Sequence, residues 1–486
     1  MILDPVTVEV IGNALGYTAE EMGIALRNAA YSHNIKERMD HSCALFDSSG
    51  KLLAQAEHIP VHLGSLPWGV KNTILYLKTR SIPLLPQDIV MVNDPYIAGT
   101  HLNDMTLVKP IFHGDKLVAF SANKAHHIDV GGIAPGSISM RATTLEQEGL
   151  IIAPVKVIEG GVPCEPVRDR FISQVRNPDI ALGDLRAQIA AVNLGEKRVI
   201  ELFERYGPET ISGVFGELLR RGEKRMIHSL QAIPPGIYRA EDCLEDITGT
   251  GNLTWIRVSL TRSAEKLLID FEGTDPQVTT PLNAVFGVTL SASYFAVKSV
   301  IAAENPLNEG DLKPLRITAP EGSLVNPRRS APVAGGNLET SQRIADTVFK
   351  ALILALPGRV PAAAHGSMNN VIVGGDDPER NRSFVYYETI GGGSGGRPGK
   401  AGVDGIQCNM THTMHTPIEA LEQYYPLLFK RYEVREGTGG AGRWPGGCGI
   451  VRSWTLLAPS AEITVLGDRT KVPPWGAAGG EPGTPG

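Results

Sequence analysis

Residues 88–132 read DIVMVNDPYIAGTHLNDMTLVKPIFHGDKLVAFSANKAHHIDVGG and contain three apolar segments separated by polar turns. The segments are DIVMVND (88–94), TLVKPIF (106–112) and KLVAFSAN (116–123). Short runs rich in Val, Ile, Phe and Thr that are bounded by turn residues are typical of β-strands. His-Gly-Asp at 113–115 joins the last two segments and supplies turn chemistry. The stretch therefore predicts neighbouring strands whose ends carry polar loops.

Outside this stretch, the spacing of apolar residues predicts both helices and strands. Apolar residues recur at helical spacing in four parts of the chain, which are 5–31, 179–231 (two helices that meet at Pro208), 285–303 and 339–356. Alternating or turn-bounded apolar runs predict a hairpin at 43–57, an antiparallel meander at 234–280, and strands separated by Gly-rich loops beyond 365.

These elements predict a mixed α+β fold in a multi-domain chain. A chain of 486 residues is long enough for several domains of about 150 residues each. We expect an N-terminal α/β region, a helical segment, an antiparallel β-rich domain, and a region with a helix and Gly-rich β structure. Their expected bounds are 1–178, 179–231, 232–330 and 331–486.

Composition excludes several classes of protein. Hydrophobic residues make up 42% and charged residues 20%, which is incompatible with wholesale disorder. The net charge of −6 offers no basic excess for nucleic acid. No secretory signal or long apolar span is visible, so we expect no membrane segment. The five cysteines form no CxxC pair and are expected to be reduced thiols of a cytoplasmic protein.

Histidine is concentrated in one part of the chain. Eight of the 12 histidines lie between residues 33 and 127, and they are His33, His41, His58, His62, His101, His113, His126 and His127. Imidazole binds divalent metals and titrates near neutral pH, so a cluster of this kind favours a functional site. Any single histidine of the set is more often a core or surface residue than part of a site, so only the cluster as a whole favours a site.

Two loops at strand ends bring histidine together with carboxylates. One supplies His101 and Asp104, which converge if their stretch forms a helical or 3₁₀ turn, and the other supplies His126, His127 and Asp129. Such a mixed N/O set suits zinc, manganese or iron(II), and without cysteine a closed structural zinc site is not expected. An open coordination position would hold a water molecule whose pKa the metal lowers.

A third polar element precedes the apolar run of 43–46. Glu37, Arg38, Asp40 and His41 place four ionisable groups within five residues. They could form a solvated helix end or a buried polar network. Their position directly before a strand gives weight to the second interpretation.

The glycine motifs do not predict nucleotide binding. GGGSGG (391–396) and GTGGAG (437–442) match GxGxxG, but the residues that follow contain Pro and Gly and are poor starts for a helix. The same objection applies to Ser394 as the nucleophile of a GxSxG elbow. SGGRPGKA (394–401) is only a near miss for a P-loop. We therefore expect no ATP site in this chain, and interpret these segments as tightly packed loops.

Several motifs, taken in their order along the chain, resemble the hydantoinase B/oxoprolinase family. They cover nearly the whole chain and include NIKERMDHSCALFD (34–47), NDPYIAGTHLNDMTLVKPIF (93–112), NKAHHIDVGGIAPGS (123–137), GGNLETSQRIAD (335–346) and GGAGRWPGGCG (439–449). The resemblance implies the metal-bearing subunit of an ATP-dependent hydrolase of cyclic amides, as in N-methylhydantoinase, 5-oxoprolinase and caprolactamase. It implies an actin-like ATPase partner (hydantoinase A-type) that phosphorylates the amide oxygen, and hence a hetero-oligomer.

The resemblance also implies which residues bind the metal. The ligand positions of the family correspond to His101, Asp104 and His126, with Asp40 as the next candidate. The sequence departs from the family at Asn103, where proline is usual, and at His412, where asparagine is usual. The family pattern usually continues past the last glycine loop, whereas this sequence stops at Gly486, so we expect either that a C-terminal segment is lost or that the sequence is part of a longer protein.

We assign expected catalytic roles to three more residues. Glu37 or His127 could move the proton of the attacking water, and Arg38 could balance phosphate charge. Two alternatives remain open at this point. The chain could be the metal-bearing subunit of an ATP-dependent ketone carboxylase, which bicarbonate dependence would reveal, or a non-catalytic scaffold for the kinase-like subunit.

Overall fold

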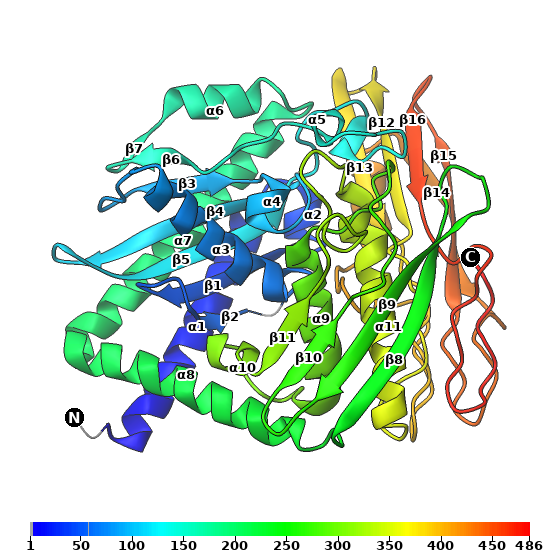
Figure 1. The fold of residues 1–486 in the computed structure, drawn as a ribbon. Helices are drawn as coiled ribbons and strands as arrows, with labels where there is room; N and C mark the ends of the chain where they lie inside the picture. Colours follow the sequence, from blue (N-terminus) through cyan, green and yellow to red (C-terminus); the bar gives the residue numbers. More distant parts are fainter. Residues whose placement is uncertain (1–2, 57) are drawn as a thin grey trace.

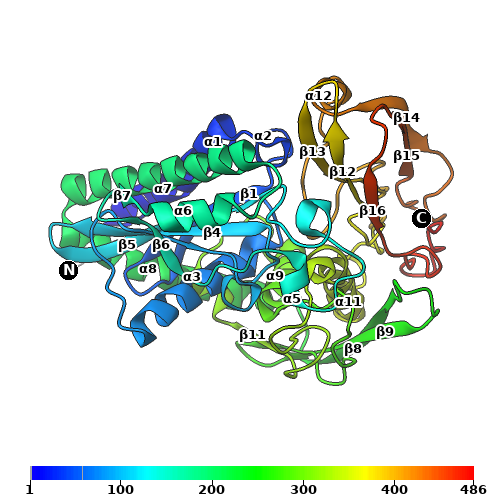
Figure 2. The ribbon, with the colours of Figure 1, turned by 90° about the horizontal axis from the view of Figure 1, so that it is seen from above.

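The computed structural model describes residues 3–56 and 58–486. Its helices and strands form a mixed α+β structure with four β-sheets (Figure 1). Seen from above, one large sheet and its helices lie on one side of the molecule and the C-terminal strands lie on the other (Figure 2). The predicted class, a multi-domain chain of mixed helix and sheet, is confirmed.

The largest sheet contains the strands that were predicted from residues 88–132. It has seven strands in the order β2-β1-β5-β4-β3-β6-β7, and all neighbouring pairs are antiparallel. The strands are β1 (His41–Asp47), β2 (Leu52–Gln55), β3 (Ile89–Val92), β4 (Asp104–His113), β5 (Lys116–His126), β6 (Val155–Glu159) and β7 (Val162–Pro163). The hairpin predicted at 43–57 is confirmed as β1 and β2, while Glu57 lies outside the described residues.

Helices cover both faces of this sheet. α1 (Pro5–Ala29) and α7 (Pro178–Tyr206) lie on one face, and α3 (His62–Thr79) and α9 (Phe286–Ile301) lie on the other (Figure 2). Side chains of β5 alternate between the two layers. Ser121 and Asn123 donate hydrogen bonds to carbonyl oxygens of α7, whereas Phe120 and Ala122 belong to the hydrophobic cluster on the α3 side.

The sequence pattern did not predict helix α3, because Pro67 and two glycines interrupt it. Packing against α9 explains why the helix forms. A Cβ on Gly64 would lie 2.8 Å from the backbone nitrogen of Ser291, so only glycine allows this approach. The Ser291 hydroxyl also accepts the N–H groups of Gly64 and Ser65, at 3.0 and 2.9 Å. Tertiary contacts therefore override a weak intrinsic helix propensity.

The second sheet contains the predicted meander. Its strands are β8 (Gly236–Glu245), β9 (Leu253–Arg262), β10 (Leu267–Asp270) and β11 (Leu315–Thr318), in the order β11-β10-β9-β8. β8 to β10 are antiparallel as predicted, and β11 adds a parallel strand beside β10. The two long helices predicted between 179 and 231 are α7 and α8 (Pro208–Leu230). Helix α11 (Ser341–Ala355) packs against β8, β9 and α9.

The C-terminal part contains the predicted strands and Gly-rich loops. A sheet of order β13-β12-β16 lies near a separate hairpin, and its elements are β12 (Asn370–Asp377), β13 (Arg382–Thr389), α12 (Ile418–Tyr424), β14 (Leu427–Arg435), β15 (Gly449–Leu456) and β16 (Glu462–Leu466). Among the described residues, no helix follows either 391–396 or 437–442 directly. Both segments therefore lack the strand-to-helix context of a nucleotide-binding loop.

Short helical turns connect these elements. They are α2 (His33–Lys36), α4 (Pro95–Ala98), η1 (Pro135–Ser137), α5 (Leu145–Glu148), α6 (Glu165–Ile172), α10 (Glu309–Leu312) and the π-helical turn η2 (Gly336–Thr340). One cluster of buried hydrophobic side chains extends from Ile59 to Leu466 and ties the sheets together. No helix in the described part of the chain combines the length and the apolar character needed to cross a membrane.

A buried ionic cluster joins α11, β8 and the C-terminal loop that follows β16. The guanidinium of Arg343 pairs with Asp468, and that of Arg469 lies 2.8 Å from Asp346 and 3.1 Å from Asp242. Each of these five side chains is almost fully buried. Buried charges of this kind persist only when they are paired, so the cluster fixes the C-terminal loop to the central sheet.

Candidate metal centre

The pairing of β4 with β5 places an aspartate beside a histidine. Asp104 begins β4 and lies directly opposite His126, the last residue of β5. The turn alone would not give this register, because a β-bulge between Ile111 and Phe112 shifts it by one residue. Without the bulge Asp104 would face Ala125, and His126 would not share its face of the sheet. The bulge therefore helps to create the site.

The loop before β4 brings His101 to the same place. Asp94 caps the short helix α4 by accepting the Tyr96 N–H, and Gly99 ends it with a φ of 88°. The Asp104 N–H then donates to the His101 carbonyl at 3.2 Å, which is the tight turn that the spacing predicted. As a result, His101 Nδ1 lies 3.1 Å from Asp104 Oδ2.

Three predicted ligands meet at this point. His101, Asp104 and His126 each offer a ligand atom, and these atoms lie within 4.8 Å of one another. His126 Nδ1 is 3.8 Å from Asp104 Oδ1, and the two imidazole rings are 4.9 Å apart between centroids. All three side chains are buried. The structure thus brings together residues from two loops that the sequence only suggested were neighbours.

The residues fit a divalent transition metal. His101 Nε2 and His126 Nε2 are buried, and neither has a hydrogen-bond partner among the described residues. Buried polar atoms of this kind are normally satisfied, so their free lone pairs indicate a missing ligand. A hollow of about 10 Å³ lies beside Asp104 and His126, and this is the size of a single water molecule or ion. Two imidazoles and a carboxylate suit zinc, manganese or iron(II).

Electrostatics keep the ligands in the form that binds metal. Burial alone would raise the pKa of Asp104, but the imidazoles of His101 and His62 hold it well below its usual range. Burial, reinforced by His101, holds the pKa of His126 well below its usual range. A carboxylate and a neutral imidazole are the states that coordinate a cation. Both side chains are therefore ready to bind at neutral pH.

Asp40, the fourth candidate, lines the same hollow. Its Oδ2 atom is 3.6 Å from His126 Nδ1, and its backbone oxygen accepts the His126 N–H at 3.1 Å. Burial raises the pKa of Asp40 to about 7, although nearby Arg38 opposes the shift. The buried polar network expected around 37–41 is thus present for Asp40 and Arg38.

His62 is a member of the site that sequence reasoning did not select. It lies at the start of α3, where its Nε2 is 3.6 Å from Asp104 Oδ2 and its Nδ1 is 2.9 Å from the Ser42 hydroxyl. The only signal in the sequence was its membership of the histidine cluster. Because α3 was not predicted, nothing indicated that this histidine faces Asp104.

Arg38 contacts the site through Tyr387, which lies between Arg38 and His126. Its guanidinium is 4.9 Å from the ring centroid of Tyr387 on β13, and it donates hydrogen bonds to Thr389 and Thr413. Tyr387 in turn stacks on His126, with centroids 4.9 Å apart and planes inclined by 10°. These contacts make Arg38 a group that positions Tyr387, and its expected contact with phosphate stays a prediction.

Three other expected residues are not brought to the hollow. His127 faces the opposite side of β5 from His126, where its Nε2 lies 2.9 Å from Gln188 Oε1. Asp129 pairs with Arg176 at 2.8 Å. Glu37 is half-buried just after α2 and does not line the hollow. The proton-transfer roles expected of Glu37 and His127 therefore lack geometric support.

Lys124 holds the loop that carries His101. This fully buried side chain donates hydrogen bonds of 2.8 Å to the Ala98 carbonyl and to the Thr100 hydroxyl. Burial lowers the pKa of Lys124 to about 8, partly opposed by Asp104. The ammonium group thus fixes both the end of α4 at Ala98 and Thr100, the residue directly before His101.

Replacing Lys124 by methionine is expected to weaken metal binding by about 10- to 100-fold, the usual effect of losing a group that orients a ligand. Methionine keeps the volume but leaves the Ala98 carbonyl unpaired, so the His101 loop loses its anchor. Competitive titration against a chelator measures the change. Lys116→Met is the matched control, because Lys116 is exposed at the other end of β5. A folded Lys124→Met protein with wild-type metal affinity would contradict this role.

Comparison with known proteins places the chain in a family. The model of the hydantoinase B/oxoprolinase family matches residues 4–486. An uncharacterized protein of Methanocaldococcus jannaschii is 49% identical over 481 residues, covering 99% of this chain and 84% of that protein. A Pseudomonas protein named as the putative B component of a D-/L-hydantoinase is 34% identical over 494 residues, covering 99% of this chain and 83% of that protein. Relatives named 5-oxoprolinase are longer, and the chain spans 37–39% of their length.

Comparison with solved structures also finds proteins that are similar to this chain. The ATP-dependent caprolactamase from Pseudomonas jessenii superposes with a TM-score of 0.87 at 30% identity, covering 94% of this chain and 79% of that one. An acetone carboxylase chain has a TM-score of 0.93 at 19% identity, covering 99% of this chain and 66% of that one. The second likeness shows a shared fold and nothing more. From the family match along almost its entire length, we conclude that the chain belongs to the hydantoinase B/oxoprolinase family.

Proposed function

We propose that this chain is the metal-dependent hydrolytic subunit of an ATP-dependent cyclic-amide hydrolase. In this proposal it acts on a substrate that an actin-like ATPase subunit of the hydantoinase A type has phosphorylated. The observation that carries the proposal is that His101, Asp104 and His126 are all buried and have ligand atoms within 4.8 Å of one another. Further support comes from relatives named as the B component of a hydantoinase and as an ATP-dependent caprolactamase.

The division of labour follows from amide chemistry. Nitrogen resonance makes an amide carbon a poor electrophile. Transfer of a phosphoryl group from ATP to the amide oxygen removes that resonance and gives an O-phosphorylated imidate and ADP. Addition of one water molecule to the activated carbon and cleavage of the C–N bond then open the ring to an amine and an acyl phosphate, and a second water molecule hydrolyses the acyl phosphate to a carboxylate and inorganic phosphate. The glycine motifs of this chain lack the context of a phosphate loop, so the partner is assigned the ATP step.

His101, Asp104 and His126 would hold the metal, and Asp40, which lines the hollow beside Asp104 and His126, would complete the set. A zinc, manganese or iron(II) ion bound there would lower the pKa of water near the activated carbon. The chain's own residues supply the orientation. Tyr387 fixes the plane of the His126 ring.

A partner and a compartment follow from the same proposal. One relative is named as a subunit of a hydantoinase, which implies that a second subunit exists there. We propose a hetero-oligomer in which the ATPase partner docks on this chain. All five cysteines are unpaired, as expected in a reducing compartment, and the proposal places the protein in the cytoplasm with its ATP supply.

The two alternatives have weaker support. A ketone carboxylase rests on the acetone carboxylase likeness, which at 19% identity carries only the fold. A non-catalytic scaffold would have no need for buried histidines with free lone pairs. Neither alternative is favoured by a specific observation.

The test is reconstitution of the full chain with its ATPase partner, ATP and a panel of hydantoin, caprolactam and 5-oxoproline. We expect ring opening of one of these amides to require both subunits and ATP, to stop when the metal is removed by a chelator, and to be independent of bicarbonate. ADP release is followed in parallel to separate phosphorylation from hydrolysis. Full ring opening by protein that elemental analysis shows to be metal-free would refute the proposal.

A further inference from the structure

Asn337 lines the small hollow beside Asp104 and His126 without belonging to the candidate ligand set. We call this hollow the metal hollow. Asn337 is only 4% exposed, and its amide oxygen Oδ1 is buried without a hydrogen-bond partner among the described residues. Buried polar atoms are normally satisfied, so this free oxygen indicates a partner that the metal hollow would contain.

An unusual backbone conformation brings Asn337 to this position. Asn337 belongs to the π-helical turn η2, which lies directly before α11. In this turn the Ser341 N–H donates to the Gly336 carbonyl, five residues earlier. A Cβ on Gly336 would lie 1.8 Å from the Asn283 carbonyl oxygen, so only glycine allows the turn to pack there. Single π-helical turns are rare and occur frequently at functional sites.

The backbone before η2 is held firmly by hydrogen bonds. The Glu148 carboxylate accepts the N–H of Val333 at 2.9 and 3.0 Å and that of Ala334 at 2.9 Å. The Gly336 N–H donates to the Pro281 carbonyl at 2.8 Å. These contacts fix the position of the turn before anything binds. An amide group that is already in place can orient a small molecule at little cost in entropy.

The same turn also supports one of the metal ligands. Glu339 Oε1 accepts a hydrogen bond of 2.9 Å from Asn370 Nδ2, and Asn370 Oδ1 accepts the Tyr387 hydroxyl at 2.9 Å. Tyr387 in turn stacks on the ring of His126. The turn η2 therefore carries Asn337 and, through Tyr387, also fixes His126. The position of the Asn337 amide relative to the metal centre is thus built into one connected set of contacts.

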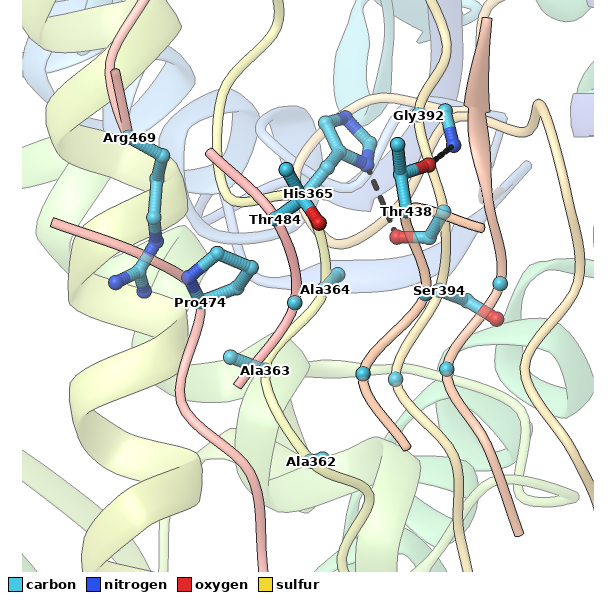
Figure 3. A pocket seen from close by; sticks show the side chains of 18 of the residues that line it. Ala362, Ala363, Ala364, His365, Gly392, Ser394, Thr438, Arg469, Pro474 and Thr484 are labelled. Carbon is cyan, nitrogen blue, oxygen red and sulfur yellow. Dashed lines mark hydrogen bonds between the residues drawn. The ribbon is translucent and has the colours of Figure 1, made fainter. Parts of the chain in front are cut away.

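The metal hollow is separate from a larger hollow among the Gly-rich loops of the C-terminal part, which His365 lines (Figure 3). Successive residues of a strand point to opposite faces, and here Tyr387 lines the metal hollow while Tyr386 lines the larger one. Asn337 lines the metal hollow and not the larger one. The partner of its amide oxygen is therefore a group at the metal centre.

The size of the metal hollow and the chemistry of its wall indicate what this partner is. The hollow, of about 10 Å³, has room for one water molecule or ion and not for a substrate ring. Two imidazoles with carboxylates suit a transition metal, whereas amide oxygens are typical ligands of Ca²⁺. We therefore expect Asn337 Oδ1 to contact a water molecule beside the metal, and not the metal itself. The low exposure of Asn337 fits contact with one enclosed water molecule.

We propose that Asn337 holds the attacking water molecule. Its Oδ1 atom accepts one O–H group of that water, which directs a lone pair of the water oxygen toward the activated carbon. An amide oxygen is a neutral acceptor, so Asn337 takes up no proton and the bonds that form and break are those of the proposed hydrolysis. The inference rests on the proposed function and adds to it a residue that touches the reacting water.

The first test compares wild type with Asn337→Leu in the full, metal-loaded chain together with its ATPase partner. Leucine has nearly the same volume as asparagine but cannot accept a hydrogen bond. We expect kcat for ring opening to fall by about 100-fold, because the water loses its orientation. KM should stay within about twofold, since the lost contact is made to water and not to the substrate. Metal affinity, measured by competition with a chelator, should equal that of wild type.

The second test does not depend on activity. Crystals of the metal-loaded wild type are expected to show one ordered water molecule at about 2.7–3.0 Å from Asn337 Oδ1, the range of a normal hydrogen bond. Crystals of metal-loaded Asn337→Leu should lack this water while keeping the metal. The comparison separates loss of the water from loss of the metal centre.

Two further variants support the interpretation. Asn337→Ala removes the amide without adding bulk, and it is expected to show the same loss of kcat, so the test does not depend on how well leucine fits. Asn193→Leu is the matched control, because Asn193 is exposed on helix α7. We expect this control to keep the kcat, the metal affinity and the ordered water of the wild type.

Three results would overturn the inference. The first is wild-type kcat in folded, metal-loaded Asn337→Leu and Asn337→Ala. The second is loss of the metal in both variants, because Asn337 would then support the metal and not the water. The third is a wild-type map in which no water lies within hydrogen-bond distance of Asn337 Oδ1. Failure of the wild type to open any cyclic amide would instead count against the proposed function, and the map would still decide whether Asn337 holds a water molecule.

Discussion

Replacing His101 by alanine is expected to remove the metal and, with it, ring opening of the cyclic amide. Loss of a group that merely orients a ligand weakens metal binding by about 10- to 100-fold, and loss of a ligand should exceed that. His101 Nδ1 is 3.1 Å from Asp104 Oδ2, so the substitution also frees the carboxylate that the imidazole orients. Elemental analysis and product formation with the reconstituted partner are the two measurements. ADP release by the ATPase partner should persist, because the proposed function assigns phosphorylation to that other subunit.

His127→Gln is the matched control for this experiment. His127 is also a buried histidine, and it follows His126 directly, but it contacts Gln188 on the other side of the sheet. The control should keep its metal and its ring-opening activity. If His101→Ala retained metal and activity, or if His127→Gln lost both, the assignment of ligands would be wrong.

The largest effect on stability is expected from Arg343→Met. Arg343 is 1% exposed and is surrounded by Asp468, Asp242 and Asp346, at 2.5, 3.6 and 4.0 Å. Removing one partner of a buried ion pair leaves an uncompensated charge and costs about 3–5 kcal/mol. After the substitution Arg469 alone would face three aspartates. Urea unfolding at neutral pH measures the loss of free energy.

We also expect the stability that Arg343→Met loses to depend on pH, and the direction of that dependence can be predicted. Burial raises the pKa of Asp346 to about 7 even with both arginines present, and without Arg343 it should rise further. A carboxyl group whose folded pKa is raised favours the folded state at low pH and loses that contribution as pH rises through the folded pKa. The difference in free energy of unfolding between the wild type and Arg343→Met should therefore be smaller at about pH 5 than at about pH 8. Equal deficits at both values would contradict this account.

Arg141→Met serves as the control for the ionic cluster. Arg141 pairs with Glu462 at 3.1 Å, but its side chain is 78% exposed, and surface pairs contribute little to stability. The double variant Arg343→Met with Asp468→Asn should recover part of the stability lost in the single variant, because it removes one of the unpaired charges. No recovery would mean that packing, and not charge, explains the effect.

Much of the N-terminal sheet could be predicted from sequence because its signals are local. The turn at 113–115 and the apolar runs on either side define a hairpin, and helix α1 has an Asp4 cap followed by Pro5. The contact between Asp104 and His126 was harder to predict from the sequence. It depends on the bulge near Ile111, which no sequence signal specified, and a register without that bulge would have separated the two residues.

Residues that come from distant segments could not be found in this way. His62 reaches Asp104 only because α3 forms, and α3 forms through contacts with α9 more than 200 residues later in the chain. Tyr387 arrives from β13, which lies in a different sheet. The side on which His127 lies could have been predicted, however. Adjacent residues of a strand point to opposite faces, so His126 and His127 could not both enter one site.

The most direct test of the central claim is an anomalous difference map from crystals of the purified, metal-loaded chain, collected at the absorption edge of its metal. The account predicts one strong peak at about 2.0–2.3 Å from ligand atoms of His101, Asp104 and His126. A stoichiometric metal bound elsewhere, or side chains of residues 101 and 126 that face apart with no peak between them, would contradict it.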